Sequence, residues 1–177
     1  MKLFVCCAAL LAFRAAPLLA QDRQAAADHA VAAARDIWQQ QSGYVTQAAE
    51  DVPEAKYGYK PTPEVRSFGQ LIAHVAGSQY MFCAAAIGDS TRSEDDIEKS
   101  KTSKADLVAA MRASNAYCAS AYRQSDDASR QTVTMFGQKR TRFYVLMNNA
   151  THDAEHYGNI VTYLRLNGMV PPSSRRQ

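Results

Sequence analysis

The sequence has no large excess of charge of one sign. Its 20 Lys and Arg residues and 17 Asp and Glu residues give a net charge of +3. Setting aside Lys2 and Arg14 near the N-terminus leaves 18 basic and 17 acidic residues, or +1. Nucleic acids and anionic membranes are bound by strongly basic surfaces. The charge balance therefore favours neither partner, and we expect a small-molecule substrate or ligand.

The sequence also lacks an apolar run of the roughly 20 residues that a transmembrane helix needs. The longest candidate, residues 3–19, follows the positive Lys2, contains Arg14 and ends before Ala20 and a polar stretch. This pattern predicts a secretory signal peptide at residues 1–20, with a short membrane anchor as the alternative. We expect an exported protein, periplasmic or secreted, that keeps no integral membrane segment.

Cysteine is scarce. Cys6 and Cys7 fall in the predicted signal peptide, which leaves Cys83 and Cys118 in the mature chain. Each lies about fifteen residues into a predicted helix, so they are level only if the two helices run parallel; antiparallel helices would separate them by roughly 15 Å. An exported location permits a disulfide. The sequence leaves open a disulfide and a pair of small buried apolar side chains.

The remaining chain has the length and apolar content of one domain, with 47% hydrophobic residues overall. Hydrophobic periodicity and helix stop signals predict helices at residues 22–50, 67–88, 103–124 and 141–167. Residues 21–170 are therefore predicted to form an all-α four-helix bundle, and residues 171–177 a polar C-terminal tail.

The predicted connections differ in character. Residues 53–63 contain three prolines, which we expect to exclude regular structure. Residues 89–101 are a polar, charged linker just long enough for a crossover that would make the second and third helices parallel. Residues 125–140 have the weakest pattern, and residues 132–137 favour a short extended piece over a helix.

Histidines provide the main functional signal. His152 and His156 stand four residues apart, so on a helix both imidazoles leave one face and can share a metal ion. His74, beside the apolar stripe of the second helix, is the candidate third ligand. Three neutral imidazoles leave coordination positions free for water or substrate, as in catalytic zinc sites. The alternatives are a hydrogen-bonded His74 and a solvated histidine pair; His29, among polar neighbours, is interpreted as a surface residue.

Three segments resemble the DinB-like superfamily of metal-binding four-helix bundles: residues 60–68 (KPTPEVRSF), 71–75 (LIAHV) and 152–160 (HDAEHYGNI). The resemblance covers essentially the whole mature chain. It implies that His74 is the first metal ligand, that His152 and His156 are the second and third, and that the protein is a homodimer. Some relatives are metal-dependent hydrolases or transferases, several acting with low-molecular-weight thiols in the cytoplasm, whereas this chain is predicted to be exported.

The expected chemistry follows from the ion. A divalent metal held by three histidines lowers the pKa of bound water to ~7, or holds a thiolate, and polarises the substrate. No Ser, Cys or Lys nucleophile is then needed. Imidazole ligands suit several metals, of which zinc and nickel are expected here. An exported bundle that binds metal or a small ligand without turnover is the alternative.

A competing motif overlaps the paired histidines. Residues 152–156 also match H-x-x-E-H, an inverted zinc-peptidase pattern in which Glu155 would be the general base. Such enzymes take a further carboxylate ligand from far downstream, but the sequence has no Asp or Glu after His156. The metallopeptidase is therefore the least favoured hypothesis. Glu155 itself is left open as a surface residue, an outer-sphere group or a base.

Overall fold

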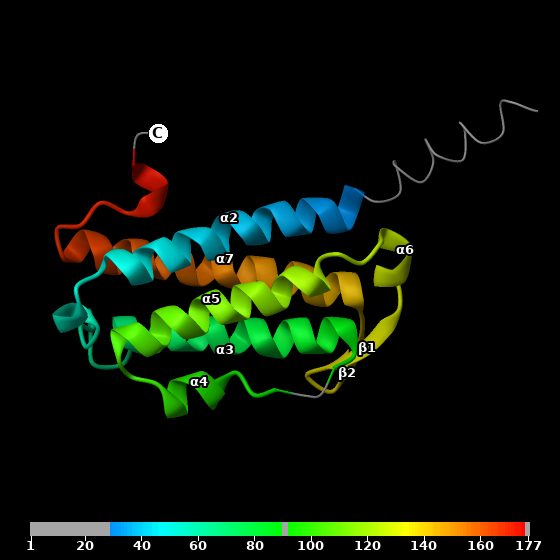
Figure 1. Ribbon diagram of the computed structural model, residues 1–177, viewed down its shortest axis with the longest axis horizontal. Helices are drawn as coiled ribbons and strands as arrows, with labels where there is room; N and C mark the ends of the chain where they lie inside the picture. The colour runs from blue at the N-terminus through cyan, green and yellow to red at the C-terminus, as the bar shows by residue number, and fades with distance from the viewer. Residues whose placement is uncertain (1–28, 90–91, 176–177) are drawn as a thin grey trace, which may run out of the picture.

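The computed structural model describes residues 29–89 and 92–175. The predicted signal peptide and the first residues of the first predicted helix lie outside this part. Four long helices form the bundle of Figure 1, which confirms the predicted all-α four-helix fold. They are α2 (His29–Asp51), α3 (Phe68–Ile87), α5 (Lys104–Ala121) and α7 (Arg142–Leu166).

The four helices form two parallel pairs. In Figure 1, α2 and α7 run from right to left, whereas α3 and α5 run from left to right. α3 packs against both α5 and α7, and α2 packs chiefly against α7. The chain between α3 and α5 returns along the outside of α3 and contains the short helix α4 (Asp95–Ser100). The predicted crossover is therefore present, with a helical turn that was not predicted.

Three residues fix the position of α3. Ser67 accepts a hydrogen bond from the backbone N–H of Gln70 and donates its own backbone N–H to the Gln70 side chain, an arrangement known as a capping box. Gly88 ends the helix in a left-handed conformation, with φ of 76°. A Cβ atom on Gly77 would lie 1.9 Å from the carbonyl oxygen of Glu94. Glycine therefore lets the crossover backbone pack directly on α3.

Cys83 of α3 and Cys118 of α5 form a disulfide, and their Cα atoms are 5.3 Å apart. Both residues are fully buried. The bridge forms because α3 and α5 run parallel, which brings the two cysteines level. This resolves the alternative that the sequence left open.

The core consists of two apolar clusters along the bundle. The first lies where α3 begins and α7 ends, and it includes Phe68, Ile72 and Ile160. The second lies where α3 ends and α7 begins, around the disulfide, and in it the Trp38 ring stacks on Tyr122 with centroids 4.6 Å apart. Measured along the bundle axis, His74 and the paired histidines of α7 lie between these two clusters.

The stretch with the weakest sequence pattern folds into a helical turn and a β-hairpin. α6 (Asp126–Ser129) places the Asp126 carboxylate where it accepts the N–H groups of Ala30 and Val31 at the start of α2. β1 (Thr132–Met135) confirms the predicted extended piece and pairs antiparallel with β2 (Gln138–Thr141). α6 and β2 were not predicted, because both are short and β2 is polar on both faces.

Two predictions need correction. The 3-10 helix η1 (Glu54–Lys56) forms in the proline-containing connection, because Pro53 precedes its first residue and no hydrogen bond needs the missing N–H. The start of the predicted polar tail folds back as η2 (Pro172–Ser174), with Pro172 buried. The Ser173 hydroxyl accepts the O–H of Tyr157 at 2.8 Å, and the Ser173 N–H donates to the Tyr157 oxygen at 2.9 Å.

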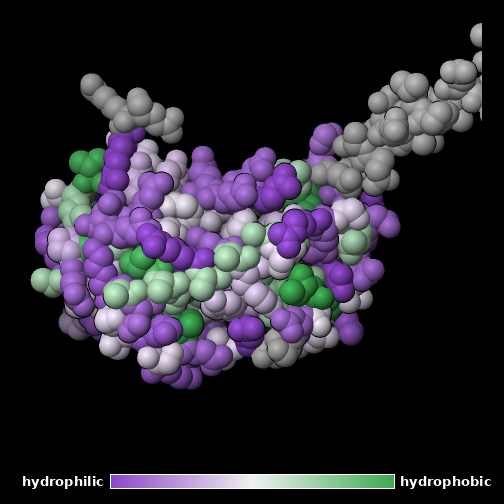
Figure 2. Space-filling view, in the orientation of Figure 1, coloured by the Kyte–Doolittle hydropathy of each residue, from purple (hydrophilic) through white to green (hydrophobic). Residues whose placement is uncertain are grey.

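The visible surface is mainly hydrophilic, with apolar residues in small separate groups (Figure 2). Within the described residues, no helix combines the length and apolar character needed to cross a membrane. His29 is exposed, as predicted.

Candidate metal centre

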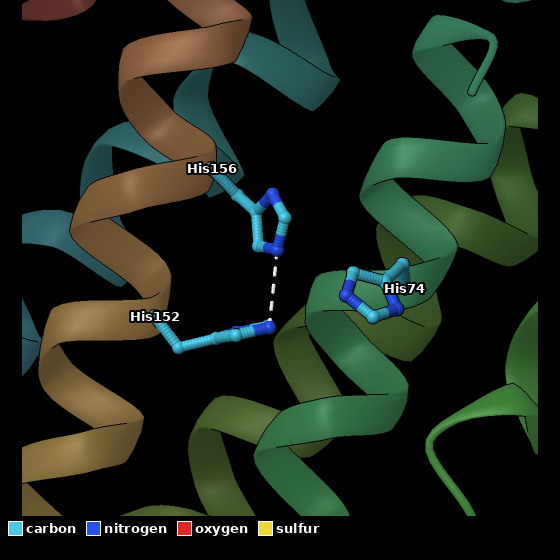
Figure 3. Close-up of side chains that lie close together, drawn as sticks. All are labelled: His74, His152 and His156. Carbon is cyan, nitrogen blue, oxygen red and sulfur yellow. Dashed lines mark hydrogen bonds between the residues drawn. The ribbon is translucent and has the colours of Figure 1, made fainter. Parts of the chain in front are cut away.

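The three candidate ligands lie together between α3 and α7. In Figure 3, His152 and His156 extend from successive turns of α7 toward His74 on α3. One ring nitrogen of each histidine lies within 4.8 Å of those of the other two. The Nε2 atoms of His152 and His156 are 3.0 Å apart. The structure thus brings together residues that the sequence places on two different helices.

Packing holds the rings in place. His74 is buried, with 6% of its surface exposed, and the other two histidines are half-buried. The Phe82 ring makes an edge-to-face contact with the His152 ring, with centroids 5.5 Å apart. The Asn159 amide lies 3.3 Å from Nδ1 of His156. The contacting atom is the amide nitrogen Nδ2. Turning the amide by 180°, which exchanges its nitrogen and oxygen, would let Asn159 accept the N–H of Nδ1 and leave Nε2 of His156 free as a ligand.

The environment keeps the histidines neutral. Burial, followed by the neighbouring His156 and His74, lowers the pKa of His152 to about 3. Burial and the neighbouring His74 lower the pKa of His156 to about 4. Burial also lowers the pKa of His74, with a smaller contribution from the positive charge of Arg66. Neutral imidazole is the form that binds a metal ion, so the three side chains are ready to bind at pH 7.

The cluster is incomplete as a hydrogen-bonded group. The Nδ1 atoms of His74 and His152 are buried and have no hydrogen-bond partner among the described residues. Leaving a buried polar atom unpaired costs about 1–3 kcal/mol. Ligand nitrogens around a tetrahedral zinc ion lie roughly 3.4 Å apart, and the His152 and His156 pair is already near this spacing. The residues therefore fit a divalent ion.

Asp153 is a buried acid that was not predicted. Its side chain is fully buried, and neither carboxyl oxygen has a partner among the described residues. Burial raises its pKa well above the usual value, which favours the protonated form. The available signal was its position, because Asp153 lies on the apolar stripe of α7 three residues after Ala150 and four before Tyr157. An acidic residue on such a stripe either has a function or lowers the stability of the fold, because its carboxyl group is buried.

Glu155 lies at the edge of the centre. Its side chain is exposed, yet its negative charge is close enough to favour the protonated forms of His74 and His156. Within the described residues, the one group able to hold an ion contains the three histidines and no carboxylate. The geometry therefore does not support the metallopeptidase hypothesis, which needs a carboxylate ligand.

A cavity of about 490 Å³ opens beside the centre. His156, Asn159 and Tyr163 of α7 line one side, and Arg66 and Glu98 lie on another. Its volume is within the range of small-molecule sites, which is roughly 300–1,000 Å³. A small molecule in this cavity would therefore lie against His156, one of the three histidines.

A family model described as the DinB superfamily matches residues 37–160, a segment that includes all three histidines. The chain belongs to the DinB superfamily. Its helical bundle and histidine arrangement agree with the resemblance seen in the sequence. No curated protein matches this DinB-superfamily chain.

Solved structures share the bundle of this DinB-superfamily chain. A DinB-like protein from Bacillus cereus has a TM-score of 0.67 and 16% identity, with 78% of this chain and 93% of that chain covered. A DinB-like protein from Bacillus subtilis has a TM-score of 0.63 and 20% identity, with 80% of this chain and 97% of that chain covered. The mycothiol-dependent maleylpyruvate isomerase has a TM-score of 0.60 and 19% identity, with 76% of this chain and 66% of that chain covered. Similarity at this level of identity establishes the fold.

Proposed function

We propose that the protein binds one divalent metal ion, zinc or nickel, through His74, His152 and His156, and that it is a metal-dependent hydrolase or thiol transferase. The observation that carries the proposal is the convergence of three neutral imidazole nitrogens within 4.8 Å of one another. The adjoining cavity, lined by His156, supports the proposal because it gives a small substrate room beside one of the ligands.

The bound ion would lower the pKa of a coordinated water to ~7, or hold a thiolate, and polarise the substrate. The protein supplies the setting for this chemistry. Burial keeps the imidazoles neutral, Phe82 restricts the His152 ring, and Asn159 orients His156. Thiol transfer is included because one structural neighbour, the maleylpyruvate isomerase, is mycothiol-dependent.

Elemental analysis of the purified mature protein tests the metal site. We expect about one metal ion per chain, lost in each of the variants His74→Ala, His152→Ala and His156→Ala. His29→Ala is the matched control, because His29 is exposed and far from the cluster in sequence. Failure of the unmodified protein to take up zinc, nickel or cobalt after reconstitution would overturn the proposal.

Turnover distinguishes an enzyme from a binding protein. The metal-loaded protein is assayed with generic ester substrates and with thiol-transfer substrates. Turnover that needs added metal and disappears in His152→Ala would support the enzyme. Tight metal binding without turnover would instead assign the alternative function, an exported metal-binding or small-ligand-binding bundle.

We also propose that the protein is exported after removal of residues 1–20 and that it forms a homodimer. The signal-like pattern of residues 1–20 supports export, and the family resemblance supports the dimer. N-terminal sequencing of the protein from the periplasm or medium tests the first proposal. Analytical ultracentrifugation tests the second, and a monomer at micromolar concentration would contradict it.

A further inference from the structure

Arg66 is a cationic residue at the entrance to the histidine centre. It immediately precedes Ser67, the N-cap of α3, and its carbonyl oxygen accepts the O–H of Tyr163 at 2.7 Å. The backbone is thus fixed to both α3 and α7. Its side chain lines the cavity of about 490 Å³ that also contains His156, and 40% of that side chain is exposed. Arg66 is therefore held beside the centre and remains accessible.

The Arg66 guanidinium has donors to spare. Its Nε atom lies 3.2 Å from Oε2 of Glu98, and this is its one hydrogen bond or ion pair among the described residues. The two terminal nitrogens therefore keep their N–H groups for another partner. A planar guanidinium binds a carboxylate through two parallel hydrogen bonds, which makes arginine well suited to this anion.

Glu64 and Glu98 are the two acidic residues that line this cavity. Glu98 binds Nε of Arg66. Glu64 is exposed, and hydrogen bonds from its own backbone and from the Thr62 side chain favour its ionised form. Arg66 and His156 line the same cavity, so the cation lies beside one of the three histidines. Arg66 is the cation available to a ligand in the cavity.

We infer that the substrate of this centre carries a carboxylate, which Arg66 holds while the reacting group lies at the histidines. This inference rests on the proposed function and specifies its substrate class. Asn159 also lines the cavity and adds a further polar group. Arg66 is a substrate-binding residue in this arrangement, and the cavity volume suits a small organic acid.

A matched pair of probes tests the inference on the cobalt-loaded protein. The probes are 3-mercaptopropionate and its neutral amide, 3-mercaptopropionamide, which share a thiol for the metal and differ in the carboxylate. Dissociation constants are measured from the change in visible Co²⁺ absorption. We expect the acid to bind about tenfold more tightly than the amide, a typical gain for a charge-assisted pair.

Three variants test whether Arg66 is the cause of the preference for the acid over the amide. In Arg66→Gln the ratio of the two dissociation constants should fall to about one, whereas direct binding of the carboxylate to the metal would leave it unchanged. In Glu98→Gln the acid should bind a few-fold more tightly, because the competing carboxylate is gone. Arg112→Gln is the control, since Arg112 is an exposed arginine that pairs with Glu50 on another face.

The outcomes separate the two proposals. Equal affinity for acid and amide in the unmodified protein, or an unchanged ratio in Arg66→Gln, would overturn the inference and leave the metal site standing. Absence of any Co²⁺ absorption would overturn the proposed function and the inference that rests on it. Circular dichroism checks that Arg66→Gln is folded, and Glu98→Gln tests the same contact in the opposite direction.

Discussion

α3 packs against its two neighbours in different ways. Its interface with α5 is closed by the disulfide between Cys83 and Cys118 and by the buried Gln79. The Gln79 oxygen accepts the Trp38 indole N–H at 2.6 Å, and its amide nitrogen donates to Ser114 at 3.0 Å. Every polar atom of Gln79 is thus paired inside the protein.

The interface of α3 with α7 is polar but incomplete. His74, His152 and His156 converge there, and two of the three Nδ1 atoms are buried without partners among the described residues. A completed buried network fixes one packing arrangement, whereas the converging ring nitrogens of the three histidines are placed to take an ion. The contrast indicates that α3 uses one side for stability and the other for binding.

We expect the largest effect from removing the disulfide between α3 and α5. Replacing both cysteines, Cys83→Ala with Cys118→Ala, should lower the free energy of unfolding by about 4 kcal/mol, because the bridge closes a loop with a sequence separation of 35 residues. Urea denaturation measures the change. Urea denaturation of the unmodified protein in the presence of a reductant should show the same decrease in the free energy of unfolding. A loss below about 1 kcal/mol would contradict a stabilising role for the bridge.

The second change removes the hydrogen bonds of the same interface. Gln79→Ala should cost about 3 kcal/mol, because it leaves the Trp38 N–H unpaired and creates a cavity. The loss should be equal in the metal-free and metal-loaded proteins. Gln39→Ala, at an exposed position of α2, should change stability by less than about 0.5 kcal/mol. A metal-dependent loss in Gln79→Ala would show that the two interfaces are coupled.

The third change affects the incomplete interface. At a free zinc concentration 100 times the dissociation constant, the unmodified protein should gain about 2.7 kcal/mol of stability. His152→Ala should lose this gain and change the metal-free stability little, because an unpaired buried nitrogen disappears with the side chain. Thermal unfolding with and without zinc measures both effects. His29→Ala should keep the whole gain, and a zinc response retained by His152→Ala would argue against this ligand.

The smallest effect is that of lowering the pH from 7 to 6. The pKa values of His152 and His156, lowered to about 3 and about 4, lie below the 6.5 of an unfolded imidazole. The metal-free protein should therefore lose stability as pH falls below about 6.5, where the unfolded chain takes up protons that the folded chain does not. At pH 6 these imidazoles are already deprotonated, so metal binding should release almost no protons from them. Calorimetry in buffers of different ionisation enthalpy measures this release; about one proton per histidine would contradict the lowered pKa values.

The long helices and the histidine pair could be predicted because both follow from spacing along one helix. The predicted helices begin at Ser67 and Ser103, and the structure has these residues as the N-caps of α3 and α5. Helix direction could not be predicted in this way, since periodicity carries no information on whether neighbours run parallel. That depended on the crossover, whose close packing at Gly77 involves residues far apart in sequence.

The candidate site was predictable only in part. His74 was a candidate third ligand from its position beside an apolar stripe, which left a hydrogen-bonded histidine as an alternative, and the family resemblance implied that it is the first ligand. The burial of Asp153 was not predicted, because helical periodicity identifies a buried face from its apolar residues and an acidic residue on that face does not contribute to the pattern. The position of Arg66 beside the centre depends on how the start of α3 meets the end of α7, where Tyr163 binds its carbonyl oxygen. Short-range patterns do not contain that contact.

The division of the histidines between α3 and α7 has a consequence for biogenesis. Synthesis proceeds from the N-terminus, so His74 is made well before His152 and His156, which belong to the last long helix. A nascent or truncated chain that stops before α7 carries one of the three ligands. Under the proposed function, metal retention therefore reports that the final helix has docked, and an incomplete chain cannot acquire a working centre.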